Sequence, residues 1–277
     1  MSEQIEAVSV NHGTPLYAEL MLRSLFKHHP ELAGLCVTVL ETPMSKYQPP
    51  KAQTDSFHSY AASRDVSVRP THLTKEEARG NTHGEILRNF VLGHRDCDYF
   101  LFLDSDVVFI QDSTIAVMLD ELKGNPDAFG VQARLSWDGE TEQPMGSMFY
   151  GGQKLNYRNK VSGPTEESVK ADTPAPHLPL AYRMGARIHP CCCLLRNSAV
   201  FRKTAEYIGF SCAFIEQAQD GRYYDTMGLL TRVMRTHDLL PMLSKMMVMH
   251  FVGVSCNMRT PEKDSTALRL LGELSAV

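Results

Sequence analysis

Two aspartates separated by one residue, Asp104 and Asp106, have the type and spacing best suited to chemistry. They close the segment FLFLDSDVVF, residues 100–109. Its apolar run is typical of a central parallel strand, so both carboxylates are expected beyond the edge of the sheet. Carboxylates there form an oxygen site for Mg²⁺ or Mn²⁺, ions that bridge the anionic oxygens of diphosphates. An Asp-Ser-Asp turn that binds nothing is the alternative.

His250 could supply a third ligand. It stands in an otherwise apolar late strand, expected over residues 246–252, and a neutral imidazole is a common metal ligand. A core histidine with satisfied hydrogen bonds is the alternative. Arg259 and Lys263 follow in a turn, where they could close over phosphates or simply face solvent.

Strands and helices alternate along the first half of the chain and must position these side chains. Pro15 stands where a helix can begin, and Asp112 and Ser113 are expected to cap a helix that ends at Leu122. The alternation predicts an α/β fold, a mostly parallel sheet flanked by helices, with ligands beyond the carboxyl ends of its strands. Strands are expected at 5–11, 36–40, 66–68, 99–103 and 129–133, further helices at 15–29 and 85–92, and irregular chain at 43–64.

The second half begins with a long irregular segment. Residues 138–187 are rich in Gly, Pro, Ser and charge, which predicts a lid that orders on ligand binding. Trp137 is expected to be buried, with stacking on an acceptor ring as the alternative. Three consecutive cysteines at 191–193 are expected in a buried strand, because zinc ligands prefer wider spacing. Later strands are expected at 188–195 and 246–252, and helices at 198–207, 225–235 and within 256–277.

The composition excludes several classes of protein. The chain has 277 residues, 43% of them hydrophobic and 22% charged, which is typical of a globular domain. Its net charge of −4 argues against a nucleic-acid binder. No apolar stretch reaches the ~20 residues of a membrane span, and the N-terminus lacks the features of a signal peptide. Together with the adjacent cysteines, these features predict a cytoplasmic protein with reduced thiols.

The surroundings of the two aspartates resemble a known family. GEILRNFVLGHRDCDYFLFLDSDVVF, residues 84–109, resembles the core of nucleotide-sugar glycosyltransferases of the GT-A fold, family 2-like. In that family a helix with Arg or Asn precedes an apolar strand that ends in a D-x-D motif. VSVNHGTPLYAELMLRSL, residues 8–25, resembles the family's first strand and helix, whose turn meets the nucleotide.

Two later segments extend the resemblance. GRYYDTMGLLTRVM, residues 221–234, resembles the helix that presents a catalytic carboxylate, and MHFVGVS, residues 249–255, resembles the strand whose His binds the metal. The family's usual Glu-Asp pair is here Tyr224-Asp225. Its Gln/Arg-x-x-Arg-Trp pattern is missing, which argues against a processive polysaccharide synthase.

The resemblance also implies roles for single residues. Asp225 would be the base that deprotonates the acceptor hydroxyl, with Asp220 as the fallback. If the configuration of the sugar is retained, Asp225 would only position it, and a plain helix cap is the structural alternative. Asp104, Asp106 and His250 would hold the metal. The implied donor contacts are Val10, Asn11, His12, Glu41, Arg88, Asn89, Asp104 and Ser105.

The sequence therefore predicts a metal-dependent glycosyltransferase using Mn²⁺ or Mg²⁺. It would move one sugar from a nucleoside diphosphate sugar, UDP-sugar first, to a small-molecule or glycoside acceptor. Residues 1–135 would bind the donor and residues 136–277 the acceptor, within one domain and with a homodimer possible. An aspartyl phosphatase using Asp104 and Asp106 is one alternative, and a non-catalytic nucleotide-binding relative is the other.

Overall fold

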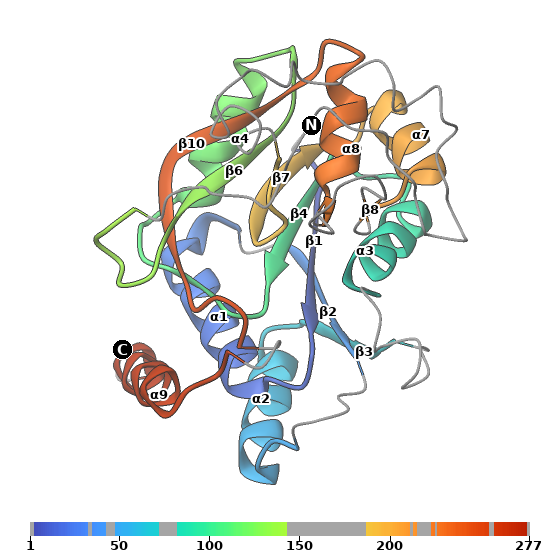
Figure 1. The fold of residues 1–277 in the computed structure, drawn as a ribbon. Helices are drawn as coiled ribbons and strands as arrows, with labels where there is room; N and C mark the ends of the chain where they lie inside the picture. The colour runs from blue at the N-terminus through green and yellow to red at the C-terminus, as the bar shows by residue number, and fades with distance from the viewer. Residues whose placement is uncertain are drawn as a thin grey trace.

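Eight strands form one sheet in the computed structural model, which describes residues 3–32, 35–42, 48–71, 82–142, 187–210, 213–214, 223–224, 226–254 and 258–275. Their order is β3-β2-β1-β4-β7-β6-β10-β5 (Figure 1). The strands are β1 Ile5–Asn11, β2 Cys36–Glu41, β3 Ser67–Pro70, β4 Tyr99–Asp104, β5 Val107–Phe109, β6 Ala128–Ser136, β7 Cys192–Arg196 and β10 Leu240–His250. Two short strands, β8 Ala213–Phe214 and β9 Tyr223–Tyr224, pair in a second sheet.

The large sheet is mostly parallel. β3, β2, β1 and β4 run parallel to one another, and β10 runs parallel to β6. β7 is antiparallel to both of its neighbours, β4 and β6, and β5 is antiparallel to β10. The carboxyl ends of β1, β2, β4, β6 and β10 therefore meet at one edge of the sheet, as expected for an α/β ligand site.

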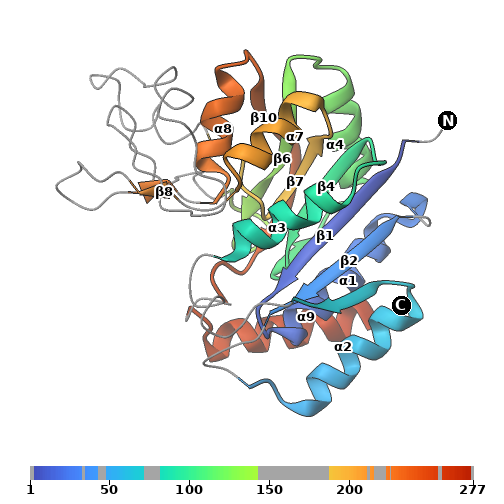
Figure 2. The same cartoon turned by 90° about the vertical axis from the view of Figure 1, so that its right-hand side faces the viewer.

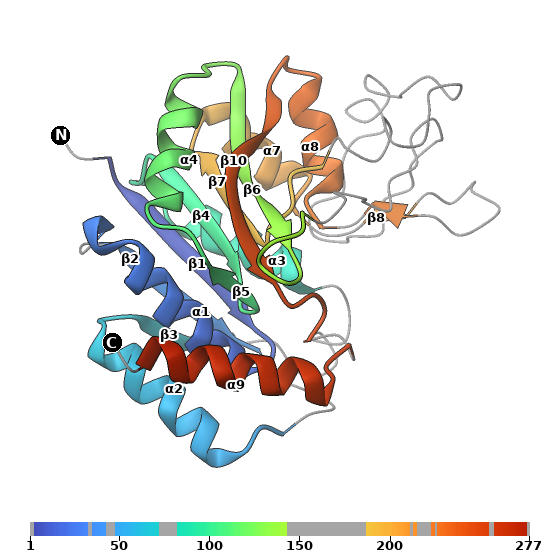
Figure 3. The same cartoon turned by 90° about the vertical axis from the view of Figure 1, so that its left-hand side faces the viewer.

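Helices cover both faces of the sheet. Figure 2 shows α3, α7 and α8 on one face, and Figure 3 shows α1, α2 and α9 on the other. Side chains of α4 join those of α1 and α2 in one apolar core, and side chains of α3, α7 and α8 form a second core. The bounds are α1 Pro15–His28, α2 Lys51–Ser63, α3 Thr82–Gly93, α4 Thr114–Lys123, α7 Ala199–Tyr207, α8 Gly228–Arg235 and α9 Pro261–Ser275, with a short 3₁₀ helix at Pro30–Leu32.

The amphipathic C-terminal helix α9 packs on the chain's own α1. Ala267 is fully buried there, and Leu270, Leu271 and Leu274 pack against the same cluster. That cluster includes Leu16, Tyr17 and Leu20 of α1 and Met249 of β10. Among the described residues, no helix has the length and apolar character that a membrane crossing requires.

The segment expected to be irregular, residues 43–64, contains the helix α2, so this prediction is wrong. Only Phe57 and Ala61 of α2 are buried. The segment therefore lacks the row of apolar residues at helical spacing from which a helix is predicted in a sequence. The other strands and helices expected in the described parts are present, with changed ends: β10 begins at Leu240 and β7 at Cys192.

The predicted cap of α4 is also wrong. Ser113 has a left-handed backbone with φ of 54° and makes no capping hydrogen bond through its side chain. The ring of His29 takes this role, because its Nε2 accepts the N–H of Ile115 at 3.2 Å. Its Nδ1 donates to the carbonyl of Leu25 at 2.8 Å.

Two predictions about side chains in the second half have opposite outcomes. Cys191, Cys192 and Cys193 are buried free thiols, as expected, but only Cys192 and Cys193 lie in β7, because Cys191 belongs to the turn directly before it. Burial raises the pKa of Cys192 to about 12. Trp137 was expected to be buried but is 62% exposed. Strand β6 ends at Ser136, so Trp137 begins the turn that follows instead of a core position.

Candidate metal centre

The two aspartates lie where the central strand ends. β4 is buried on both faces between β1 and β7, and Asp104 is its last residue. The backbone N–H of Asp104 donates to the carbonyl of Cys191 at 2.8 Å. The carbonyl of Asp106 accepts the N–H of Phe251 at 3.1 Å. These backbone bonds tie the aspartate turn to β7 and to the chain leaving β10.

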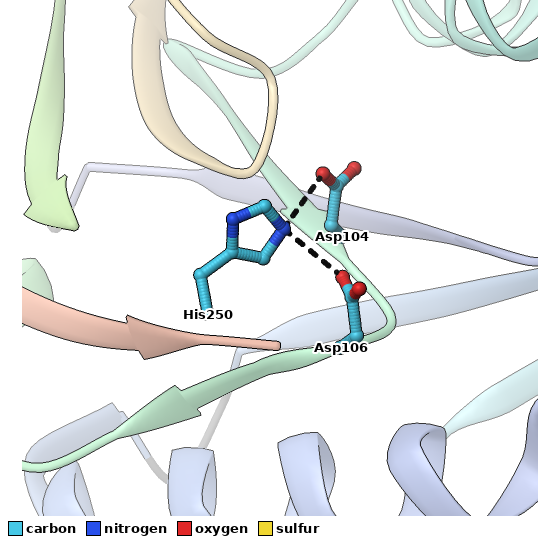
Figure 4. Close-up of side chains that lie close together, drawn as sticks. All are labelled: Asp104, Asp106 and His250. Carbon is cyan, nitrogen blue, oxygen red and sulfur yellow. Dashed lines mark ion pairs between the residues drawn. The ribbon is translucent and has the colours of Figure 1, made fainter. Parts of the chain in front are cut away.

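Strand pairing brings His250 to the same place. β5 follows Asp106 directly and pairs antiparallel with the end of β10, so that Val107 lies opposite His250. Nε2 of His250 is 3.2 Å from Oδ1 of Asp106 and 3.7 Å from Oδ2 of Asp104 (Figure 4). One ligand atom from each of the three residues lies within 4.8 Å of the other two.

The group is buried, and its charges perturb one another. Burial raises the pKa of Asp106, but the attraction of His250 and hydrogen bonds from the backbone outweigh burial, so the pKa of Asp106 is below its usual value. For His250, burial lowers the pKa, but the carboxylates of Asp106 and then Asp104 outweigh it, so the net pKa is raised. Two carboxylates beside an imidazole favour positive charge between them.

The donor set fits a divalent cation. Carboxylate oxygens suit Mg²⁺ and Mn²⁺, and an imidazole nitrogen shifts the preference toward Mn²⁺ over Mg²⁺. Asp106 and His250 are each only 6% exposed. These two buried side chains would shield a bound ion from water. Nδ1 of His250 is buried, with no hydrogen-bond partner among the described residues. In the part of the chain that the structure describes, this is the one such group of His, Cys, Asp or Glu side chains.

Several of the expected donor contacts lie at the same edge of the sheet. Oδ1 of Asn11 accepts the backbone N–H of Thr14 at 2.9 Å and its hydroxyl at 3.1 Å. The Thr14 hydroxyl also lies 3.3 Å from the hydroxyl of Ser105, which links the first turn to the aspartate turn. Nδ2 of Asn11 donates to Glu41 at 3.4 Å, and Glu41 also contacts His58 at 3.1 Å.

Three of the expected donor contacts are placed differently. The Val10 side chain is buried in the apolar core, not at the edge. The guanidinium of Arg88 donates to the carbonyls of Ala205 and Glu206 at 3.0 and 2.8 Å, where it satisfies the last turn of α7. Asn89 is exposed on α3. The structure therefore does not bring Arg88 or Asn89 to the carboxylates.

Arg259 and Lys263 are both held by hydrogen bonds after β10. Arg259 pairs with Asp264 at 2.7 Å, and Asp264 also accepts the hydroxyl of Tyr17 at 2.7 Å. Lys263 donates to the carbonyls of Val252 and Met258 at 2.7 and 2.9 Å. Lys263 is close enough to His250 to oppose the rise in its pKa.

Two further histidines lie near the carboxylates, and sequence reasoning missed one of them, His83. Nε2 of His83 is 3.5 Å from Oδ1 of Asp104. The ring of His189 lies edge-on to His250, with centroids 6.0 Å apart, and its Nδ1 accepts the N–H of Cys191 at 3.2 Å. His83 directly precedes Gly84, the first residue of the segment that resembles the family. This closeness to the segment is the sequence signal that could have identified His83.

The predicted catalytic residue lies outside the described residues. Asp225, its fallback Asp220 and residues 143–186 of the expected lid are not among them. The strand β9 ends directly before Asp225, and α8 begins shortly after it.

No protein-family model and no curated protein matches this sequence. Solved structures match over the whole chain. Mannosyltransferase PcManGT from Pyrobaculum calidifontis, in complex with GDP-Man and Mn²⁺, is 9% identical with a TM-score of 0.52, and the match covers 100% of this chain and 75% of that one. TarS 1–349 from S. aureus, in complex with UDP-GlcNAc, is 13% identical with a TM-score of 0.50, with 98% and 66% covered.

These similarities show the fold of the chain. The mixed, mostly parallel sheet with helices on both faces is the fold of the GT-A glycosyltransferases, as the sequence predicted. The chain spans 39% of one TarS chain and 65% of a TarS 1–349 chain.

Proposed function

We propose that this GT-A chain is a metal-dependent glycosyltransferase that moves one sugar from a nucleoside diphosphate sugar to an acceptor hydroxyl. The observation that carries the proposal is the convergence of Asp104, Asp106 and His250 at the carboxyl edge of the sheet. Open α/β sheets bind ligands at this edge. PcManGT and TarS 1–349 are each described with a nucleoside diphosphate sugar, and PcManGT also with Mn²⁺.

The three side chains would hold Mn²⁺ or Mg²⁺, with Mn²⁺ favoured by the imidazole. A bound divalent ion supplies Lewis acidity, which stabilises the charge that develops on the leaving diphosphate. The backbone bonds from Asp104 to Cys191 and from Phe251 to Asp106 keep both carboxylates in place. Rigid placement matters because a pre-positioned charge is not reorganised during the reaction.

We assign the nucleoside to the carboxyl ends of β1 and β2. Asn11 bonds there to Glu41 directly and is linked through Thr14 to Ser105 of the aspartate turn. Arg259 and Lys263 are assigned to the diphosphate, because their hydrogen bonds hold two cations just beyond β10. Arg88 and Asn89 are left out, since they lie within α3 and do not follow a strand, and Arg88 bonds to the last turn of α7.

We assign Asp225 as the base that takes the proton from the acceptor hydroxyl. UDP-sugars are the first donors to test. Because the chain lacks the polymerising motif, we assign a single transfer to a small molecule or glycoside. This part of the proposal rests on the sequence resemblance.

A thermal-shift panel tests the proposal. UDP, GDP, CDP, dTDP and phosphate are each added with and without Mn²⁺. A ligand at 100 times its dissociation constant adds about 2.7 kcal/mol, which raises the melting temperature by about 5–10 °C in a domain near this size. One nucleoside diphosphate should stabilise the protein only when Mn²⁺ is present.

Two variants give the panel its control. Asp106→Asn should lose the Mn²⁺-dependent shift, whereas Asp96→Asn, at an exposed position in the turn before β4, should keep it. A response to phosphate and Mg²⁺ alone would favour the phosphatase. Nucleotide binding without turnover of any donor sugar would favour the non-catalytic relative.

A further inference from the structure

A row of polar contacts leads from strand β2 to the metal centre. Oγ1 of Thr42 is 2.7 Å from Nδ1 of His12, and Nε2 of His12 is 3.4 Å from Nδ1 of His83. Nε2 of His83 lies 3.5 Å from Oδ1 of Asp104. The four residues come from three separate parts of the sheet edge and from the first turn of α3, so no local sequence motif unites them.

Asp104, the acceptor at the end of the row, determines which residue is the donor in each contact. A metal-binding carboxylate accepts hydrogen bonds, so the nitrogen of His83 that faces Oδ1 of Asp104 is the donor in this contact. In a neutral imidazole the other nitrogen then accepts, which makes His12 the donor to His83 and Thr42 the donor to His12. Burial lowers the pKa of His12 to about 3, so His12 is neutral at physiological pH.

The Thr42 hydroxyl is free to donate in this direction. Its contact with the carbonyl of Asn11 is 3.5 Å, much longer than the 2.7 Å contact with His12. The backbone N–H of Thr42 already donates to the same carbonyl at 2.9 Å. Strands β1 and β2 thus anchor the start of the row through their backbones.

The two oxygens of the Asp104 carboxylate face different side chains. Oδ1 faces His83, and Oδ2 faces Nε2 of His250 at 3.7 Å. The side chain of Asp104 is 21% exposed, whereas that of Asp106 is 7% exposed. Asp104 is thus the less enclosed of the two carboxylates. Because fewer neighbours hold it, the contact with His83 restricts the rotation of its side chain most.

We propose that His83, backed by His12 and Thr42, is a positioning residue that fixes the Asp104 carboxylate so that Oδ2 faces the metal. The proposal rests on the metal site of the proposed function. Residues that hydrogen-bond to metal ligands orient them, and their loss typically weakens metal binding by about 10–100-fold. His12 then acts on the metal through His83, which differs from the nucleotide contact expected from the sequence.

The test measures Mn²⁺ binding to the full chain by calorimetry, with no nucleotide present. His83→Phe keeps a planar ring but removes both nitrogens, and should weaken Mn²⁺ binding by about 10-fold or more. His83→Gln keeps an N–H donor and should recover part of that loss. The control is His237→Phe, at an exposed position before β10, which should bind Mn²⁺ like the wild type.

A double-mutant cycle tests the order of the row. His12→Phe should weaken Mn²⁺ binding on its own but add no further loss in a His83→Phe background. The melting temperature of each metal-free variant separates a binding defect from a folding defect. Should His83→Phe not fold, His83→Gln and His12→Phe still supply the comparison.

The outcomes separate this inference from the proposed function. Equal Mn²⁺ affinity in wild type and His83→Phe would overturn the role of His83 and leave the metal site intact. Independent, additive losses from His12→Phe and His83→Phe would overturn the relay. A wild-type chain that binds no Mn²⁺ would overturn the metal site itself.

Discussion

The contact between β6 and β7 leaves no room for a side chain at Gly130. A Cβ at this position would lie 2.6 Å from Cδ2 of Leu195, 2.8 Å from Cδ1 of Ile188 and 3.0 Å from the carbonyl of Leu194. Both side chains are fully buried, and the carbonyl belongs to the strand that pairs with β4. Gly130→Ala should therefore push β7 away from β6.

The cost follows from two opposing contributions. Overpacking a core costs about 1–3 kcal/mol, and replacing Gly by Ala in a strand returns roughly 0.5–1 kcal/mol. The net loss of up to about 2.5 kcal/mol should lower the melting temperature by up to about 10 °C. Because Cys191, directly before β7, accepts the N–H of Asp104, Mn²⁺ binding should weaken as well.

Scanning fluorimetry and urea unfolding measure both effects. Gly272→Ala is the matched control: it lies in α9, where a Cβ meets nothing within 4 Å. It should stabilise the protein by roughly 0.5–1 kcal/mol, because Gly costs that much in a helix. If Gly130→Ala is as stable as Gly272→Ala, the tight contact between β6 and β7 is not present in solution.

Three further predictions concern other parts of the chain. Burial lowers the pKa of His29 below 6.5, so its stabilising contribution is complete above pH 6.5 and is lost as the pH falls below that value. In urea unfolding, the stability lost in His29→Gln should be smaller at pH 5.5 than at pH 7.5, by at most about 1.4 kcal/mol per pH unit. Equal losses at the two pH values would contradict this prediction. Arg88→Ala should cost about 1–3 kcal/mol of stability, because it removes the donor to the carbonyl of Glu206 at the end of α7. Thermal unfolding checks this, and an unchanged melting temperature would contradict the capping role. Asp225→Asn should keep Mn²⁺-dependent nucleotide affinity and lose turnover by about 10²-fold or more, measured as release of nucleoside diphosphate; a rate near that of the wild type would make Asp225 a helix cap only.

Strong local patterns were predictable from the sequence. The unbroken apolar run of β4 and the proline at the start of α1 indicate their elements without help from the rest of the fold. Helix α2 was missed because it buries only Phe57 and Ala61. Residue type alone predicts a cap of α4 from Asp112 and Ser113, whereas the ring of His29, distant in sequence, accepts the N–H of Ile115.

The candidate site was predictable in part. Asp104, Asp106 and His250 were identified as a metal group, and β5 and β10 bring them together as the fold resemblance implied. The contacts of His83 with His12 and of Arg88 with α7 depend on how helices pack against the sheet. Such packing leaves no trace in local spacing, so sequence reasoning missed His83 and misplaced Arg88.

The alternative of an aspartyl phosphatase has lost support. The fold is that of the GT-A glycosyltransferases, and within the described residues the carboxylates of Asp104 and Asp106 converge with a histidine and no further acidic side chain. A non-catalytic nucleotide-binding relative would share both features. Turnover of a donor sugar separates that alternative from the proposed enzyme.

The most direct test of the central claim is a crystal grown with Mn²⁺ and the nucleoside diphosphate selected by the thermal-shift panel, measured for anomalous scattering from manganese. The account predicts one strong peak coordinated by Asp104, Asp106 and His250, with the diphosphate completing the coordination of the ion. A nucleotide bound at the edge of the sheet without a manganese peak between these three side chains would contradict it.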